Sequence, residues 1–167
     1  MARGPTTGVH LSENNRLSRG QARFSGQIDD WVMQTQQRMT AVLRESARRV
    51  IEEMQKPVNE GGNMPIDTGF LRASLTVVIN GEPPIADRIS DGQRYAYNAS
   101  VITLEIAKFN AGDRMVAAYT ADYARHVEYG TGERQGRGFT RLASQQWGRI
   151  VSEVTAEAKQ RVAARAR

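Results

Sequence analysis

The chain has 167 residues, of which 40% are hydrophobic and 25% charged, so its size suits one compact domain of roughly 100 to 150 residues with extensions. It has no cysteine, which excludes disulfide scaffolds, thiolate metal sites and thiol nucleophiles, and its two histidines cannot complete a zinc site alone. The net charge of +5 at pH 7 is uneven: residues 1–26 carry four basic and one acidic side chains, residues 27–132 carry 11 and 14, and residues 133–167 carry eight and three.

The two basic ends have two interpretations. They are solvated helix faces, or they are arms that contact nucleic acid or an acidic neighbouring subunit. The N-terminus lacks the apolar stretch of a secretory signal, and no segment approaches the ~20 apolar residues that span a bilayer. We therefore expect a soluble protein, intracellular at synthesis, with no membrane partner.

Residues 1–24 are rich in Gly, Ser, Thr, Asn and Arg and hold too few apolar side chains to repay the entropy of folding alone. We expect an extended polar arm that neighbouring chains hold in place, followed by a single domain at 25–167. Ser25 is a candidate N-cap for an amphipathic helix of about 30 residues, roughly 45 Å long, that ends before Pro57. Such a helix either packs against a neighbouring chain or frays at one end. Its apolar positions recur at a spacing of three to four residues: Ile28, Trp31, Val32, Met39, Val42, Leu43, Val50, Ile51 and Met54.

Three later segments, 74–80, 100–109 and 114–120, alternate apolar and polar residues with the period of two expected of strands that bury one face. Residues 110–113 (Asn-Ala-Gly-Asp) join the second and third as a hairpin connection. Residues 81–98 form a long inter-strand loop or an extended hairpin, a length that is typical of binding loops. The residues expected on the buried face are Leu75, Val77, Ile79, Ile102, Leu104, Ile106, Met115, Ala117 and Tyr119.

A helical turn at 123–129, a glycine-rich loop at 130–138 and an amphipathic helix from Phe139 nearly to the C-terminus complete the chain. The predicted fold is α+β: a small antiparallel sheet packed against a long N-terminal helix and a C-terminal helix, with an extended N-terminal arm.

No motif indicates an active site, so we expect no catalytic residue, cofactor or metal. Residues 67–69 spell the Asp-Thr-Gly of aspartic proteases, but that tripeptide follows an apolar strand in an all-β fold, whereas here a helix and a Gly-Gly loop precede it. Asp67 is instead expected to cap a short turn, and Gly69 is expected to permit a tight turn of the backbone. The glycine-rich loop lacks the spacing of a phosphate-binding loop, and His126 and Glu128 lie two apart, on different helix faces.

Two segments together resemble the tail-completion, or neck, protein family of long-tailed bacteriophages. The first follows the pattern Pro-hydrophobic-Asp-Thr-Gly-x-Leu-Arg-x-Ser and the second Tyr-Ala-x-x-Val-Glu-aromatic-Gly-Thr, and the resemblance covers roughly residues 28–150. This chain has Gly138 where the family usually has a proline before the Phe that opens the last helix. The matching residues are Pro65, Asp67, Thr68, Gly69, Leu71, Arg72, Ser74, Tyr123, Ala124, Val127, Glu128, Tyr129, Gly130 and Thr131.

The resemblance implies a structural protein of the virion neck that is not an enzyme. It implies a homo-oligomeric ring, usually a hexamer, between the head-completion or connector protein and the tail terminator or tail tube protein, with DNA passing through or stopping near the lumen. The protein would be in the host cytoplasm during assembly and in the virion afterwards. From the residues alone, Tyr123 and Val127 share a helical face that anchors the turn, and Gly130 ends it in a left-handed conformation.

Basic residues in the arm and the glycine-rich loop are candidates for contacts with a partner or with DNA: Arg3, Arg16, Arg19, Arg23, Arg134 and Arg137. The alternative function is that of a small basic nucleic-acid-binding protein that uses its C-terminal helix. Against it, the helix interleaves its basic residues with Glu153 and Glu157, and no aromatic stacking platform accompanies them. Those basic residues are Arg141, Arg149, Lys159, Arg161 and Arg165.

Overall fold

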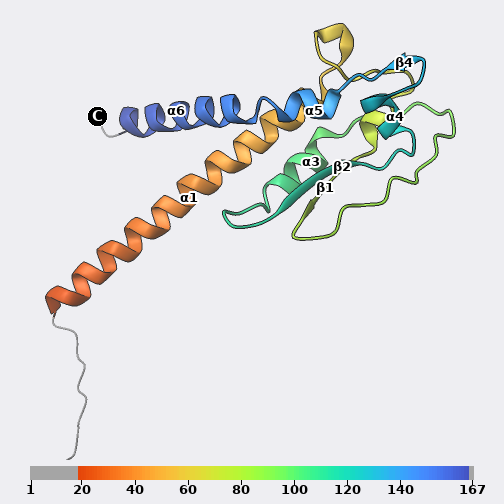
Figure 1. Ribbon diagram of the computed structural model, residues 1–167. Coiled ribbons are helices and arrows are strands. Elements are labelled where there is room, and N and C mark those ends of the chain that lie inside the picture. The colour runs from red at the N-terminus through yellow and green to blue at the C-terminus, as the bar shows by residue number, and fades with distance from the viewer. Residues whose placement is uncertain (1–18, 166–167) are drawn as a thin grey trace, which may run out of the picture. The chain divides into compact units, whose positions relative to one another are not determined.

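A computed structural model describes residues 19–165 (Figure 1). These residues divide into two units between Thr35 and Gln36. The predicted α+β class is confirmed. Residues 1–18 of the arm that was expected at 1–24 lie outside the described residues. The elements are α1 (Arg19–Gln55), the 3₁₀ turn η1 (Val58–Glu60), α2 (Phe70–Ala73), β1 (Leu75–Ile79), α3 (Ala99–Ile106), β2 (Met115–Tyr119), α4 (Ala124–Tyr129), β3 (Gly130–Thr131), β4 (Arg134–Gln135), α5 (Phe139–Ser144) and α6 (Trp147–Arg165).

The long helix α1 begins earlier than predicted. Ser25 is not its N-cap but lies inside the helix, and residues 19–24, assigned to the arm, form its first turns. Gln, Ala and Arg in this segment are good helix formers, and Phe24 lies four residues before Ile28, so the apolar spacing continues into it. Composition alone underestimated the length of the helix, because its N-terminal turns are polar on all sides except one face.

The main sheet pairs β1 with β2 in antiparallel register. Leu75 lies opposite Tyr119 and Val77 opposite Ala117, so both strands present the predicted face to the same side. Leu75, Val77 and Tyr119 are buried in the core. Both of these strands are confirmed, and the other residues predicted on their inner face, Ile79, Met115 and Ala117, are partly buried against the same core.

The predicted middle strand at 100–109 is wrong, because this segment forms the helix α3. The Asn98 side chain caps the helix by accepting hydrogen bonds from the backbone N–H groups of Ser100 (3.1 Å) and Val101 (3.4 Å). Ile102 and Ile106, four residues apart, are buried, whereas Leu104 is 66% exposed. Residues 110–113 therefore connect a helix to a strand and form no hairpin.

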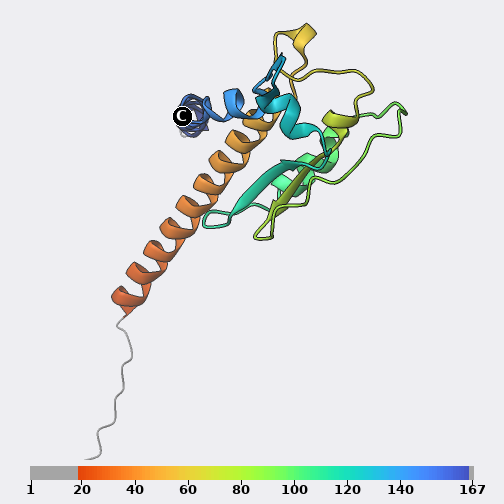
Figure 2. The same ribbon diagram turned by 45° about the vertical axis from the view of Figure 1, so that its right-hand side comes forward.

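One layer of helices covers the apolar face of the sheet. The views in Figures 1 and 2 place α3 along β1 and β2, and the buried residues of α1 and α3 belong to the same cluster as those of the strands. The α3–β2 turn is tied to α1 through Arg44, whose Nε donates to the Phe109 carbonyl (2.6 Å) and whose Nη2 donates to Asn110 Oδ1 (3.0 Å). These bonds fix the C-terminal part of α1 against the rest of the second unit, which begins at Gln36 and which we call the α+β unit.

The connection at 81–98 runs from β1 to α3 and is held against its own chain. The Tyr95 N–H donates to the Thr68 carbonyl (2.8 Å), and the Tyr95 ring meets Phe70 edge-on with centroids 5.0 Å apart. Arg88 forms an isolated bridge with Ala121. The connection is thus neither an inter-strand loop nor an extended hairpin.

The predicted C-terminal helix consists of two parts separated by a turn at residues 145–146. Phe139 in α5 is 2% exposed and meets Tyr119 edge-on, with ring centroids 5.0 Å apart. Ile150 and Val154 bury one side of α6. Within residues 19–165, none of the helices combines the length and apolarity that a bilayer crossing needs.

The cap at Asn98 explains why the 100–109 segment is helical, and this explanation is testable. Asn98→Ala should lower the free energy of unfolding by about 0.5–2 kcal/mol, because two N–H groups at the start of α3 lose their acceptor. Asn98→Asp keeps an acceptor oxygen and should retain stability close to that of the unchanged protein. Urea unfolding followed by circular dichroism measures both, and equal stability of the two variants would contradict this role of Asn98.

Candidate interaction surfaces

The first motif segment, Pro65 to Ser74, sets the shape of the backbone before β1. Gly69 has φ +83°, and a Cβ there would lie 2.3 Å from the Tyr95 carbonyl oxygen, so the position requires glycine. Phe70 and Leu71 enter the core, as predicted. Arg72 places its guanidinium 4.9 Å from the centre of the Tyr97 ring. The segment therefore orders the 81–98 connection on the domain.

The predicted cap by Asp67 is wrong. Gly69 is the N-cap of α2, no side chain caps this helix, and Asp67 is exposed. The Thr68 hydroxyl instead accepts from the Phe70 N–H (3.3 Å). Because the left-handed Gly69 is the N-cap, Asp67 lies two residues too early to take the usual capping geometry.

The second motif segment, Tyr123 to Thr131, binds the start of α5, which lies further along the chain. The Glu128 carboxylate, 6% exposed, accepts from the backbone N–H groups of Thr140 and Arg141, both at 2.9 Å. These two groups belong to the first turn of α5, where the helix dipole favours negative charge. Glu128 therefore performs the role of an N-cap side chain although ten residues separate it from the N-cap position, Gly138.

Close backbone contacts explain the glycines in this loop. A Cβ on Gly130 would lie 2.3 Å from the Arg134 carbonyl oxygen, and one on Gly136 would lie 2.4 Å from the Glu128 carbonyl oxygen. Gly130 ends α4 with φ +88° and ψ 176°, so its φ is positive as predicted but its ψ is extended rather than left-handed helical. Gly138 has φ +64°, which proline cannot adopt.

The remaining residues of the second segment pack as expected or are exposed. Tyr123 and Val127 pack against the core cluster, which confirms their predicted anchoring role. Ala124 is buried, whereas Tyr129 is 66% exposed, with the Arg141 guanidinium 6.0 Å from its ring centre.

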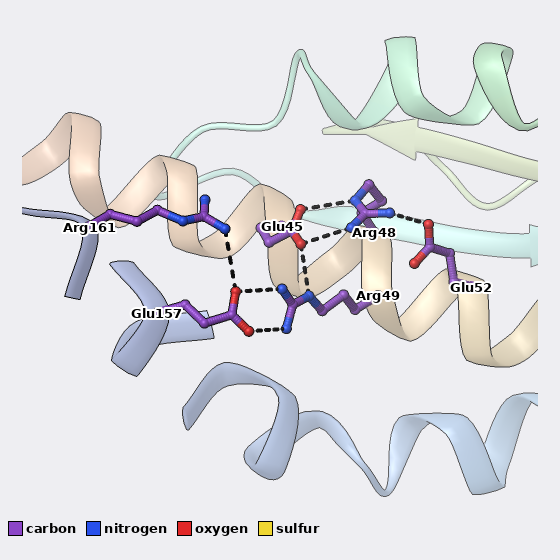
Figure 3. A network of polar contacts seen from close by, with 6 residues as sticks. All are labelled: Glu45, Arg48, Arg49, Glu52, Glu157 and Arg161. Carbon is purple, nitrogen blue, oxygen red and sulfur yellow. Dashed lines mark hydrogen bonds and ion pairs between the residues drawn. The ribbon is translucent and has the colours of Figure 1, made fainter. Parts of the chain in front are cut away.

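A network of ion pairs joins α1 to α6 (Figure 3). Arg49 donates from Nη1 to Glu157 Oε1 (2.8 Å) and from Nη2 to Glu157 Oε2 (2.7 Å), a bidentate pair between the two helices. Arg49 also donates from Nε to Glu45 (2.8 Å), which accepts two further bonds from Arg48. Glu52 pairs with Arg48, and Arg161 lies 3.6 Å from Glu157.

The network shifts the pKa of its carboxyl groups. Hydrogen bonds from Arg48 and then Arg49 lower the pKa of Glu45 from 4.5 to about 2, against the opposing effect of burial. The pKa of Glu157 is lowered as well, first by its hydrogen bonds with Arg49. Both carboxylates therefore stay charged at neutral pH.

An apolar groove lies between the same two helices. It has a volume of about 560 Å³, and we call it the α1–α6 groove. From α1 it is lined by Arg38, Met39, Val42 and Leu43, and from α6 by Thr155, Ala158, Lys159, Val162 and Ala163. Met39 and Val162 are 54% and 45% exposed, so apolar side chains here face solvent.

A second apolar surface lies in the other unit of the chain, on α1. Phe24 and Trp31 are 64% and 68% exposed, and Ile28 and Val32 are 44% and 40% exposed. Their spacing places these four side chains on one helical face, which we call the α1 stripe.

A basic cleft of about 580 Å³ brings the two motif segments together. Arg134 and Arg137, two of the predicted contact residues, line it with His126. Pro65 comes from the first motif segment, and Val127 and Thr131 come from the second. Of the other predicted contact residues, Arg19 and Arg23 belong to α1, and Arg3 and Arg16 lie outside the described residues.

Sequence reasoning missed the α6 side of the groove. The small residues Ala158 and Ala163 gave no signal, because alanine is common on any helix; only the length predicted for α1 suggested a contact with a neighbour.

Within residues 19–165, no group of three or more His, Asp or Glu side chains is placed to hold a metal ion.

A scan of protein-family models, curated proteins and solved structures gives no match to the chain.

The distant cap at α5 predicts a measurable loss on substitution. Glu128→Gln keeps the size of the side chain but turns an amide NH₂ toward one of two N–H donors, and should lower the free energy of unfolding by about 1–3 kcal/mol. Glu133→Gln changes an exposed residue of the same loop and is the matched control, with a change close to zero. Equal chemical-denaturation midpoints for the two variants would disprove the cap.

The ion-pair network predicts a specific acid response. Because the folded protein lowers the pKa of Glu45 from 4.5 to about 2, the stabilisation from its carboxylate is present above pH 4.5 and is lost as pH falls toward 2. Glu45→Gln should therefore make stability fall less steeply across this window. Urea unfolding at several pH values measures this slope. The matched control is Glu53→Gln, which lies on the same helix but outside the network, and its stability should fall as steeply with pH as that of the unchanged protein.

Proposed function

We propose that this chain is a structural subunit of the neck of a long-tailed bacteriophage, closing into a ring that joins the head-completion proteins to the top of the tail tube. The observation that carries the proposal is the α1 stripe. Phe24 and Trp31 leave most of their surface in water, although burying such a side chain is favourable by about 1.5–3 kcal/mol. Large apolar side chains exposed together on one helical face are typical of surfaces that meet another protein.

The geometry of the two motif segments supports the same function. Gly69, Gly130 and Gly136 meet backbone at distances that admit no side chain, and Glu128 ties the second segment to α5. Each of these residues shapes the chain itself. A ring subunit needs such fixed backbone, because every interface repeats around the axis and small errors in angle accumulate.

In this proposal the basic cleft at Arg134 and Arg137 contacts an acidic face of a neighbouring ring or the DNA in the lumen. The ring holds six copies, as the resemblance implies, and assembles in the host cytoplasm before it becomes part of the virion. The proposal assigns the chain no catalytic step.

The alternative function, a nucleic-acid-binding protein that uses α5 and α6, has less support. Arg149 pairs with Glu153 (2.7 Å), Arg161 lies by Glu157, and Arg141 lies over the Tyr129 ring. Contacts with phosphates would have to compete with these partners. The neck function requires self-association, whereas the alternative requires binding to nucleic acid, so one experiment separates them.

We expect electron micrographs of the concentrated, purified protein to show closed rings with rotational symmetry. Arg149→Gln combined with Arg165→Gln should leave the rings unchanged. If the protein is instead a monomer that binds duplex DNA, and this double variant reduces the salt slope of binding by about two, the nucleic-acid function is correct and the neck function is wrong.

A further inference from the structure

We propose that the α1 stripe of one copy docks into the α1–α6 groove of a second copy. This inference rests on the proposed function and adds to it the two surfaces that join adjacent subunits. It commits to one occupant of the groove, which is residues 24–32 of another molecule of the same chain.

The shapes of the two surfaces suit each other. A groove between two helices accepts the apolar face of a third helix, and such a helix presents anchors at i, i+3, i+4 and i+7. The stripe has this spacing, because Ile28, Trp31 and Val32 follow Phe24 by four, seven and eight residues. On the groove side, Ala158 and Ala163 leave room between α1 and α6 for a large side chain such as that of Trp31.

The charges of the two surfaces are complementary. Asp29 and Asp30 flank the stripe, and both are exposed. Among the described residues, the charged side chains that line the groove are those of Arg38 and Lys159, and none is acidic. An incoming stripe therefore places its carboxylates beside the basic rim while its apolar side chains enter the groove, which favours the encounter and sets the orientation.

The two surfaces are different parts of the chain, and this limits the assemblies that they can form. A copy that inserts its stripe into a neighbour keeps its own groove open, and the neighbour keeps its own stripe open. Such a head-to-tail contact generates a closed ring when the rotation between copies closes, and a filament when it does not. A reciprocal two-fold dimer, in which each copy's stripe enters the other copy's groove, would instead use both stripes and both grooves and leave neither surface open.

The test uses three aspartate substitutions at exposed apolar positions. Trp31→Asp disrupts the stripe, Val162→Asp disrupts the groove, and Leu104→Asp, at a residue on α3 that is 66% exposed, is the matched control. We expect the first two to weaken self-association about 30-fold or more, since a central tryptophan or a charge in an apolar pocket has the effect of a hot-spot change. The control should assemble like the unchanged protein in sedimentation velocity.

Mixing the variants is the decisive step. The Trp31→Asp copy has an intact groove and the Val162→Asp copy has an intact stripe, so the two should form a one-to-one heterodimer although each alone is monomeric. Asp29→Asn with Asp30→Asn should weaken assembly less and reduce its dependence on salt. Circular dichroism of each variant checks that it is folded.

The outcomes separate this inference from the proposed function. Rings that persist in both Trp31→Asp and Val162→Asp would overturn the docking while leaving a ring-forming protein. Loss of assembly in both without rescue on mixing would also overturn it, because a stripe-to-groove contact requires rescue. An unchanged protein that remains a monomer up to its solubility limit would overturn the docking, and DNA binding with a steep salt slope would then overturn the proposed function as well.

Discussion

The bidentate pair between Arg49 and Glu157 is the contact on which the outer surface of the α+β unit depends. Its energy is modest, because the Glu157 side chain is 40% exposed and water screens the charges. Its value is geometric: two parallel hydrogen bonds fix both the distance and the rotation of α6 against α1. The groove lies between these helices, with Met39 and Val42 on one side and Ala158 on the other, so its width follows from that pair.

The second constraint acts at the other end of the C-terminal region. Glu128 anchors the first turn of α5, and α5 is followed after two residues by α6. The path from the sheet to α6 is therefore defined by one buried carboxylate and by the glycines that let the loop close. The cap and the ion pairs act on successive parts of the chain. The cap sets where the C-terminal helices start, and Arg49 then sets how α6 lies beside α1.

Much of the fold could be predicted from periodicity, and the errors have a common cause. In β1, Leu75 and Val77 alternate beside β-branched neighbours, which favour a strand. In α3, Ile102, Leu104 and Ile106 satisfy a period of two, but Ile102 and Ile106 also satisfy a spacing of four. An apolar run of this length is ambiguous, and Asn98, which decides it, lies outside the run. Periodicity also could not locate the start of α1, because a polar first turn carries little periodic signal.

The surfaces could be predicted only where one local segment forms them. The α1 stripe is visible in the sequence because its four residues lie within nine positions of one helix. The groove is not, because Arg49 and Glu157 are 108 residues apart and nothing in either segment indicates the other. A local pattern can show that a helix has an unsatisfied apolar face, but what covers that face depends on contacts between distant segments, or between chains. This explains why the sequence shows an apolar face on α1 that its own helix cannot cover, whereas the groove that we propose for it could be found only in the structure.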